Sequence, residues 1–192
     1  MTTTTTLRQL NGFDETPATF EDAVLVLVDY QNTYTGGVME LDGWEPALAS
    51  ASRLLARARE LGTPVVHIRD GGYGIDTEPG TLHASVAPRE GEAVVTKSVP
   101  NGFHGTDLHE IIEATGRKNL IIAGFMTNMC TLFTTEGAFL HGYAPTVVAD
   151  ASATRALHSP AGALTAQQIH QAALATITEL YGVVVATGAE LK

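Results

Sequence analysis

Three residues of this chain have side chains suited to nucleophilic hydrolysis. Cys130 is the only cysteine among the 192 residues, and a thiol can attack a carbonyl carbon once its proton has been removed. Asp29 ends an apolar run and could accept that proton, while Lys97 ends another run and could orient both groups. Each residue also has a simpler explanation: a small core residue, a loop cap and a lysine that reaches into solvent.

Apolar runs and helical patterns alternate along the chain and predict how these residues are positioned. Six short apolar runs suit buried strands, at residues 23–29, 64–69, 93–97, 119–124, 144–150 and 183–187. Helical patterns that end near a glycine lie between them, at 46–61, 106–115, 127–141 and 165–181. This order predicts a three-layer α/β/α sandwich with a mainly parallel six-stranded sheet, a Rossmann-like fold. Because ligands bind at the carboxyl ends of such strands, we expect the three residues at one edge of the sheet.

The segment that leads to Cys130 has the features of a nucleophile turn. Thr127 is a natural N-cap, which would place Cys130 at the third helical position. The positive end of the helix and the charge of Lys97 are expected to stabilise a thiolate there and to lower the thiol pKa. The unpaired N–H groups of the first helical turn could also hold an oxyanion.

The composition indicates which classes of binding partner and which cellular location to expect. A formal net charge of −10 disfavours contact with phosphate backbones, so we expect no nucleic-acid partner. No apolar run approaches the roughly 20 residues of a membrane helix, so we expect no membrane partner. One cysteine and an N-terminus without the apolar segment of a secretory signal predict a cytoplasmic protein. Residues 1–21 are expected to form an arm, disordered or ordered against another subunit, before a single domain at 22–192.

Four segments together resemble the isochorismatase-like cysteine hydrolases, a group that includes nicotinamidases, N-carbamoyl amidohydrolases and other amidases. Residues 25–31 resemble the family's acid-bearing strand, and Lys97 with residues 103–108 resembles its lysine strand and the segment after it. Residues 120–130 resemble its nucleophile motif, and residues 147–153 match the strand that follows. It implies the isochorismatase-like hydrolase fold and a hydrolase that cleaves a C–N bond of a small molecule through a thioester. Family members are usually dimers or tetramers, so the resemblance also implies a homo-oligomer.

The resemblance assigns roles within the site. Cys130 would be the nucleophile and Asp29 the general base and acid, with Lys97 between them as the third member of a catalytic triad. The family pattern places a cis peptide bond between Phe125 and Met126, and the amides of Met126 and Cys130 would form the oxyanion hole. Candidate residues to frame a cyclic or planar amide substrate are Tyr30, Gln31, Tyr34, Trp44, His67, Tyr73, Phe103 and Phe133.

Departures from the family pattern reduce the number of reactions that we expect the protein to catalyse. Residues 67–73 do not reproduce the Asp-x-His metal site of nicotinamidases, so we expect neither a metal nor another cofactor. Isochorismatases cleave a vinyl ether without a thiol nucleophile, so the presence of Cys130 favours C–N hydrolysis. Streptothricin hydrolase, a lactam-opening member of the group, is one candidate likeness. Two alternatives stay open: a vinyl-ether hydrolase that uses Asp29 as its acid, and a non-catalytic binding protein with the same fold.

Overall fold

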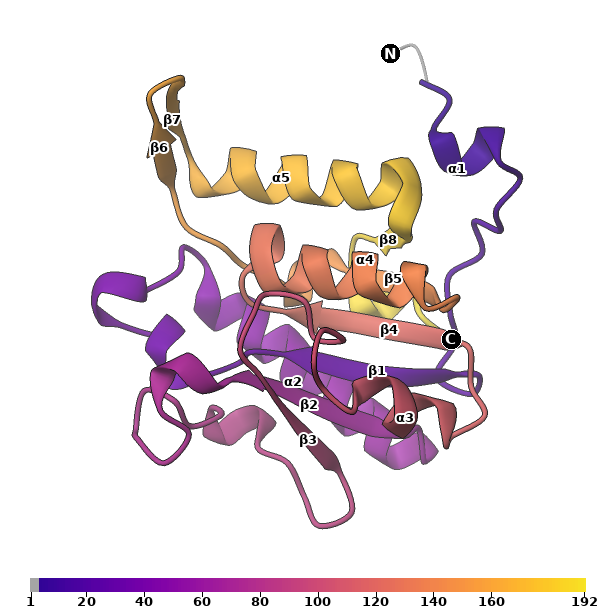
Figure 1. Cartoon of the computed structure of the whole chain (residues 1–192), viewed down its shortest axis with the longest axis horizontal. Coiled ribbons are helices and arrows are strands. Elements are labelled where there is room, and N and C mark those ends of the chain that lie inside the picture. The colour runs from indigo at the N-terminus through magenta and orange to yellow at the C-terminus, as the bar shows by residue number, and fades with distance from the viewer. Residues whose placement is uncertain (1–3) are drawn as a thin grey trace.

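The computed structural model describes residues 4–192 and is built around a six-stranded parallel sheet in the order β3-β2-β1-β4-β5-β8 (Figure 1). The sheet strands are β1 (Ala23–Val28), β2 (Val65–Asp70), β3 (Ala93–Lys97), β4 (Asn119–Gly124), β5 (Ala144–Val148) and β8 (Val183–Val185). The α-helices are α1 (Leu7–Leu10), α2 (Trp44–Leu61), α3 (Leu108–Glu113), α4 (Leu132–Leu140) and α5 (Ala166–Thr176). Within the described residues, no helix is long and apolar enough to span a membrane.

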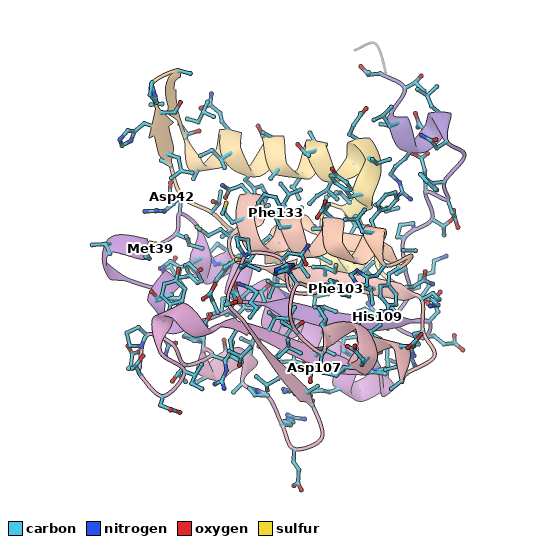
Figure 2. All side chains as sticks on the ribbon, viewed as in Figure 1. Met39, Asp42, Phe103, Asp107, His109 and Phe133 are labelled. Atoms are coloured by element: carbon cyan, nitrogen blue, oxygen red, sulfur yellow. The ribbon has the colours of Figure 1, made fainter. Side chains whose placement is uncertain are left out.

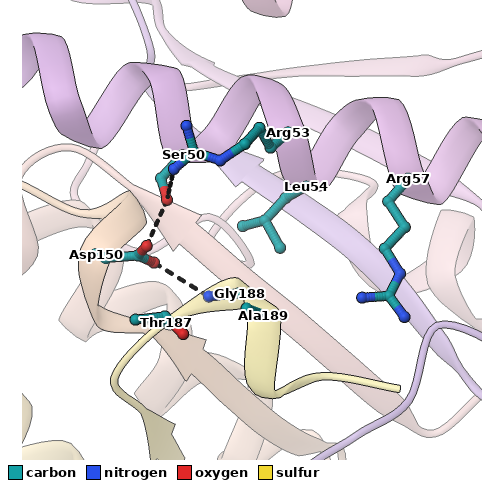
Figure 3. Close-up of a pocket in the computed structure, with 8 residues that line it drawn as sticks. All are labelled: Ser50, Arg53, Leu54, Arg57, Asp150, Thr187, Gly188 and Ala189. Carbon is teal, nitrogen blue, oxygen red and sulfur yellow. Dashed lines mark hydrogen bonds between the residues drawn. The ribbon is translucent and has the colours of Figure 1, made fainter.

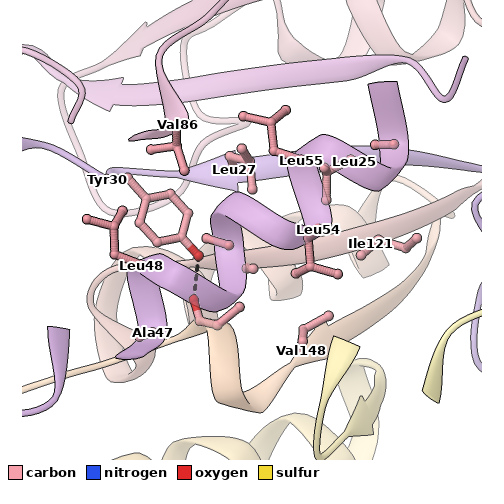
Figure 4. Packing of buried hydrophobic residues seen from close by; sticks show 14 of the residues in the cluster. Leu25, Leu27, Tyr30, Ala47, Leu48, Leu54, Leu55, Val86, Ile121 and Val148 are labelled. Carbon is pink, nitrogen blue, oxygen red and sulfur yellow. Dashed lines mark hydrogen bonds between the residues drawn. The ribbon is translucent and has the colours of Figure 1, made fainter. Parts of the chain in front are cut away.

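The predicted α/β/α architecture with a parallel six-stranded sheet is confirmed, and β1 shows why both faces of the sheet are covered. All six residues of β1 are buried, and their side chains alternate between the two faces because successive residues of a strand point in opposite directions. Leu25 and Leu27 pack against α2 in one core (Figure 4). The three valines of β1 pack on the other face, with residues of α3 and α4. The continuous apolar run therefore reflects burial in two cores.

The helical segment that carries Cys130 begins differently from the prediction. A π-helical turn, Thr127–Thr131, precedes α4, and its N-cap residue is Met126. The predicted N-cap at Thr127 is wrong: its hydroxyl pairs with Nδ1 of His170 at 2.8 Å, and its N–H donates to the carbonyl oxygen of Ala153 at 3.0 Å. Thr127 is thus the first helical residue, and Cys130 is the fourth rather than the third.

Residues 4–21 pack against their own chain. Arg8 is buried, and its guanidinium donates to the carbonyl oxygen of Leu180 at 3.1 Å. Further along the segment, the backbone N–H of Ala18 donates to a threonine hydroxyl of β5 at 2.9 Å. The described part of the expected arm is thus ordered against its own chain, and its contact with another subunit stays a prediction. Residues 1–3 of the expected arm lie outside the described residues.

A short antiparallel hairpin, β6 (Leu157–Ser159) and β7 (Gly162–Leu164), was not predicted. Figure 1 shows that it projects from the body of the protein beside the start of α5. Every residue of both strands is exposed. The two three-residue strands contain no buried apolar run and no sustained alternation, so the patterns that revealed the sheet strands are missing here.

Asp150, the second residue after β5, joins α2 to the segment that follows β8. Ser50 of α2 donates its hydroxyl to Asp150 Oδ2 at 2.5 Å, and the backbone N–H of Gly188 donates to Asp150 Oδ1 at 3.2 Å (Figure 3). Arg53 and Arg57 of α2 line the same surface pocket. None of Asp29, Lys97 and Cys130 is among its lining residues, so this pocket is separate from the predicted triad.

Gly124, the last residue of β4, has no room for a side chain. A Cβ atom there would lie 2.3 Å from the carbonyl oxygen of Val28 and 2.6 Å from its Cβ. We expect Gly124→Ala to lower the free energy of unfolding by about 1–3 kcal/mol, because this backbone contact cannot relax cheaply. Urea denaturation followed by circular dichroism would measure the change.

Gly36→Ala is the matched control for this prediction. The backbone of Gly36 is extended, and a Cβ there would meet nothing within 4 Å. Its effect on the free energy of unfolding should stay within about 0.5 kcal/mol. Equal denaturation midpoints for the two variants would contradict the close packing at Gly124.

Candidate active site

The carboxyl ends of four neighbouring strands bring four ionisable groups together. Lys97 is the last residue of β3, Asp70 is the last residue of β2, Asp29 directly follows β1, and Cys130 lies in the turn after β4. Because these four strands are adjacent in the sheet, their carboxyl ends meet at one edge. The structure therefore brings together the three residues predicted as a triad and adds Asp70 to them.

The ammonium group of Lys97 is the centre of this cluster. Its Nζ lies 2.8 Å from Asp29 Oδ2, 3.0 Å from Asp70 Oδ2 and 3.2 Å from Cys130 Sγ. A lysine ammonium has three N–H donors, so each neighbour can receive one of them. One ligand atom from each of these three neighbours lies within 4.8 Å of the others, a spacing that could also suit a metal ion. Here the positive charge among them is supplied by Lys97.

Asp29 is completely buried and holds an uncommon backbone conformation. Its φ is +52°, in the left-handed region that non-glycine residues rarely adopt, and its N–H donates to the carbonyl oxygen of Ile68 at 2.9 Å. Apart from the ion pair with Lys97, neither carboxylate oxygen has a hydrogen-bond partner among residues 4–192. Asp29 therefore has acceptor positions available beside the thiol.

Burial dominates the electrostatics of the cluster. It raises the pKa of Asp29 to about 6, although the charge of Lys97 acts in the opposite direction. Burial and the charge of Asp29 raise the pKa of Cys130 to about 12. Burial alone would lower the pKa of Lys97, but the charges of Asp29 and Cys130 raise it above its ordinary value. At neutral pH the cluster thus holds an ammonium, a mostly ionised Asp29 and a neutral thiol.

The prediction of a lowered thiol pKa at Cys130 is therefore wrong. The side chain is only 5 % exposed, and removal from water disfavours the thiolate. The adjacent Asp29 charge disfavours it further, and together these effects outweigh Lys97. The sequence identifies charged residues that could lie near Cys130, but the extent of burial determines whether the thiol pKa is raised or lowered.

The turn between β4 and Cys130 contains both predicted oxyanion-hole residues. The peptide bond between Phe125 and Met126 is cis, and the next residue, Thr127, is fixed by its hydrogen bond to Ala153. Met126 is partly exposed, whereas Cys130 is buried. The backbone N–H groups of Met126 and Cys130 thus belong to one short turn at the edge of the sheet.

Two of the predicted substrate-binding residues lie beside the cluster. The hydroxyl groups of Tyr34 and Tyr73 are 3.1 Å apart, and their rings meet edge to face. Burial, the hydrogen bond to Tyr73 and the charges of Asp29 and Cys130 raise the pKa of Tyr34, which places this phenol within the field of the cluster. Tyr73 is the partly exposed member of the pair.

Tyr30 and Gln31 were also predicted to contact substrate, but both are buried. The Tyr30 hydroxyl donates to the carbonyl oxygen of Ala151 within the core shown in Figure 4. Gln31 Oε1 accepts the N–H of Asp70 at 2.8 Å, and Gln31 Nε2 donates to the carbonyl oxygen of Asp70 at 3.0 Å. Gln31 thus fixes the backbone of Asp70 instead of facing a ligand.

His67 and Phe103 are not brought to the cluster. His67 lies in the middle of β2, where its Nε2 pairs with Glu92 at 3.0 Å. Phe103 stacks on His141, beyond the far end of α4, with 4.8 Å between ring centroids. Figure 2 shows Phe103 near His109 of α3, away from the start of α4.

Trp44 and Phe133 lie at the beginnings of two helices. Trp44 is the first residue of α2, and its ring centroid is 6.3 Å from that of His83. Phe133 is 40 % exposed and lies three residues after Cys130. It is labelled near the start of α4 in Figure 2.

Comparisons with known proteins identify the family of this chain. The isochorismatase domain family matches residues 23–190. The uncharacterized isochorismatase family protein YddQ of Bacillus subtilis (strain 168) is 36 % identical over 176 residues, with 88 % of this chain and 98 % of that protein covered. Maleamate amidohydrolase of Pseudomonas putida is 30 % identical over 196 residues, with 91 % of this chain and 84 % of that protein covered.

A solved structure supports the same assignment across the whole fold. The crystal structure of an isochorismatase from Pseudomonas putida KT2440 has a TM-score of 0.94 to this structure and 36 % sequence identity, covering 99 % of this chain and 100 % of that chain. The four segments that resembled the family in sequence lie within the matched domain. The chain therefore belongs to the isochorismatase family of hydrolases.

Proposed function

We propose that this protein is a cysteine-dependent amidohydrolase that cleaves a C–N bond of a small molecule through a thioester. The observation that supports the proposal is that the Cys130 thiol and the buried Asp29 carboxylate share one Lys97 ammonium. A nucleophile, a base with available acceptor positions and a group that orients both are the parts that this reaction needs. The matched relatives include maleamate amidohydrolase and streptothricin hydrolase, the candidate likeness named above.

In the proposed mechanism, Asp29 accepts the thiol proton while the Cys130 sulfur attacks the substrate carbonyl carbon. The carbonyl electron pair moves to oxygen, and the N–H groups of Met126 and Cys130 stabilise the oxyanion. When the carbonyl re-forms, the C–N bond breaks and protonated Asp29 gives its proton to the leaving nitrogen. The products of this half-reaction are an amine or ammonia and a thioester.

The second half-reaction restores the resting site. Asp29 takes a proton from water as the water oxygen attacks the thioester carbonyl carbon. The tetrahedral intermediate expels the Cys130 sulfur, which receives the proton back from Asp29, and the carboxylic acid leaves. Lys97 stays protonated throughout, because the negative charges around it raise its pKa above the ordinary lysine value. It stabilises negative charge wherever that charge lies, on Asp29 or on the sulfur.

The thioester is tested directly with the Cys130→Ala variant. We expect intact-protein mass spectrometry, after acid quench during turnover of a panel of primary amides, N-carbamoyl compounds and lactams, to show a covalent adduct on the native protein and none on Cys130→Ala. Turnover by the variant should fall by at least about 10³-fold. Circular dichroism controls for folding of the variant.

Alkylation distinguishes the alternatives. Because the chain has one cysteine, iodoacetamide modifies a single thiol position. Full activity after complete alkylation would contradict the thioester and favour a vinyl-ether hydrolase that uses Asp29 as its acid. Binding of a panel compound without turnover, by both the native protein and Cys130→Ala, would favour the non-catalytic binding protein.

The pH dependence of kcat/KM tests the role of Asp29. The pKa of this base is raised to about 6, and the base must be ionised to accept the thiol proton. We expect kcat/KM to fall as the pH decreases through about 6, approaching tenfold per pH unit. Lys97→Met removes a charge that lowers the pKa of Asp29, so this acid limb should move to higher pH. An acid limb at the same pH in Lys97→Met would contradict the assignment of Asp29 as the base.

A further inference from the structure

We infer that Asp70 is a positioning residue of this site: it draws the Lys97 ammonium toward itself and so limits how readily Cys130 loses its proton. The inference rests on the function proposed above for Cys130 and Asp29. Asp70 was not among the residues predicted for catalysis, and its carboxylate and the Cys130 thiol are both hydrogen-bonded to the Lys97 ammonium. It therefore acts on the reaction through another residue.

Asp70 is held in place at its backbone and at its side chain. Gln31 bonds to both its N–H and its carbonyl oxygen, at 2.8 and 3.0 Å. Its Oδ1 accepts the N–H of Gly72 at 2.8 Å, which leaves Oδ2 directed to Lys97 at 3.0 Å. An acid that forms only an incidental surface ion pair with a lysine would not be expected to have these three additional hydrogen bonds. The carboxylate is thus a built part of the cluster.

The charges of the cluster show what Asp70 does there. Two carboxylates, Asp29 and Asp70, share one ammonium, so the positive charge that would stabilise a Cys130 thiolate is already divided between them. A thiolate would add another negative charge to a site where Lys97, Asp29 and Cys130 are each 5 % exposed or less. Asp70 also acts on Asp29, since its charge contributes to the raised pKa of that carboxyl group. Removing the Asp70 charge should therefore ease ionisation of both groups.

Among residues 4–192, the groups found beside Asp29 and Cys130 are Lys97 of β3, Asp70 of β2 and the phenol of Tyr34 from the segment after β1. The Tyr73 hydroxyl lies 3.1 Å from that of Tyr34. Among the described residues, Lys97 is the only cation that pairs with Asp29 or Asp70. A change of charge at Asp70 is consequently felt mainly through this lysine.

Asp70→Asn tests the inference because it removes the charge and keeps an oxygen that can accept from Gly72. The first readout is the second-order rate constant for iodoacetamide alkylation of Cys130 between pH 7 and 9, which needs no substrate. A nearby charge shifts a pKa by about one unit or more, so we expect alkylation about tenfold faster in Asp70→Asn. Asp70→Glu keeps the charge and should stay within about twofold of the native rate.

The second readout is the acid limb of kcat/KM, which separates an electrostatic role from a change in access to the thiol. In Asp70→Asn the limb should move to lower pH by about one unit, and in Asp70→Glu it should remain in place. Better access alone would raise the alkylation rate without moving this limb. Asp70→Ser, which also removes the charge, should move the limb in the same direction, and it replaces Asp70→Asn if circular dichroism shows that variant to be unfolded.

Two outcomes would overturn the inference. An unchanged limb together with an alkylation rate within twofold of native would show that Asp70 does not act on the thiol. A change confined to KM would assign Asp70, whose side chain is 22 % exposed, to direct contact with substrate. Failure of the proposed function looks different: Cys130→Ala would keep its turnover, whatever the alkylation rates of the Asp70 variants show.

Discussion

One buried ammonium determines how this edge of the sheet is built. A cation taken out of water is stable only when it is paired and hydrogen-bonded, and Lys97 meets that requirement with three partners for its three donors. Each partner comes from a different strand end, so the order β3-β2-β1-β4 is a condition for the cluster as well as a description of the sheet. Loss of Lys97 would leave two carboxylates, one of them completely buried, without the cation that they share.

The burial of this cluster also determines the protonation states of its reacting groups. With a pKa raised to about 12, Cys130 is a neutral thiol at rest, while Asp29 is mostly ionised above its pKa of about 6. A preformed thiolate is therefore a minor species, and in the proposed mechanism proton transfer to Asp29 accompanies attack on the carbonyl carbon. Under that mechanism, the neutral thiol would be a weak nucleophile at rest and would be activated by proton transfer when a substrate is correctly placed. Reactivity then depends on positioning more than on the resting charge of the sulfur.

Sequence patterns located most of this arrangement because strand ends are visible in sequence. The apolar runs of β1, β3 and β4 end at or just before Asp29, Lys97 and the nucleophile turn, and the rule that ligands meet carboxyl ends selected those residues. Asp70 was placed after the second run, which was taken to end at Arg69, and it was not assigned to the triad. In the structure β2 extends one residue further, and the register pairs Asp70 directly with Lys97.

The side chains around the cluster were harder to predict because burial depends on the path of the chain. Tyr30 and Gln31 directly follow Asp29, yet both are buried and hydrogen-bonded to backbone groups of other segments. Phe103 carries an aromatic ring suited to a substrate, yet it stacks at the distal end of α4. Local composition identifies such residues as candidates, and only tertiary packing separates a lining residue from a supporting one.

The position of Cys130 follows from the sheet and not from the capping of its own helix. The N–H of Phe125 donates to Val28 of β1 at 2.9 Å, and the N–H of Thr127 donates to Ala153 at 3.0 Å. These bonds hold the turn between β1 and the segment after β5, on both sides of the strand that leads into it. The distance between Cys130 and Lys97 is thus set by strand register and by the close contact of Gly124 with Val28. Substitutions in the sheet that contact none of the reacting groups should therefore alter the reaction by moving this turn.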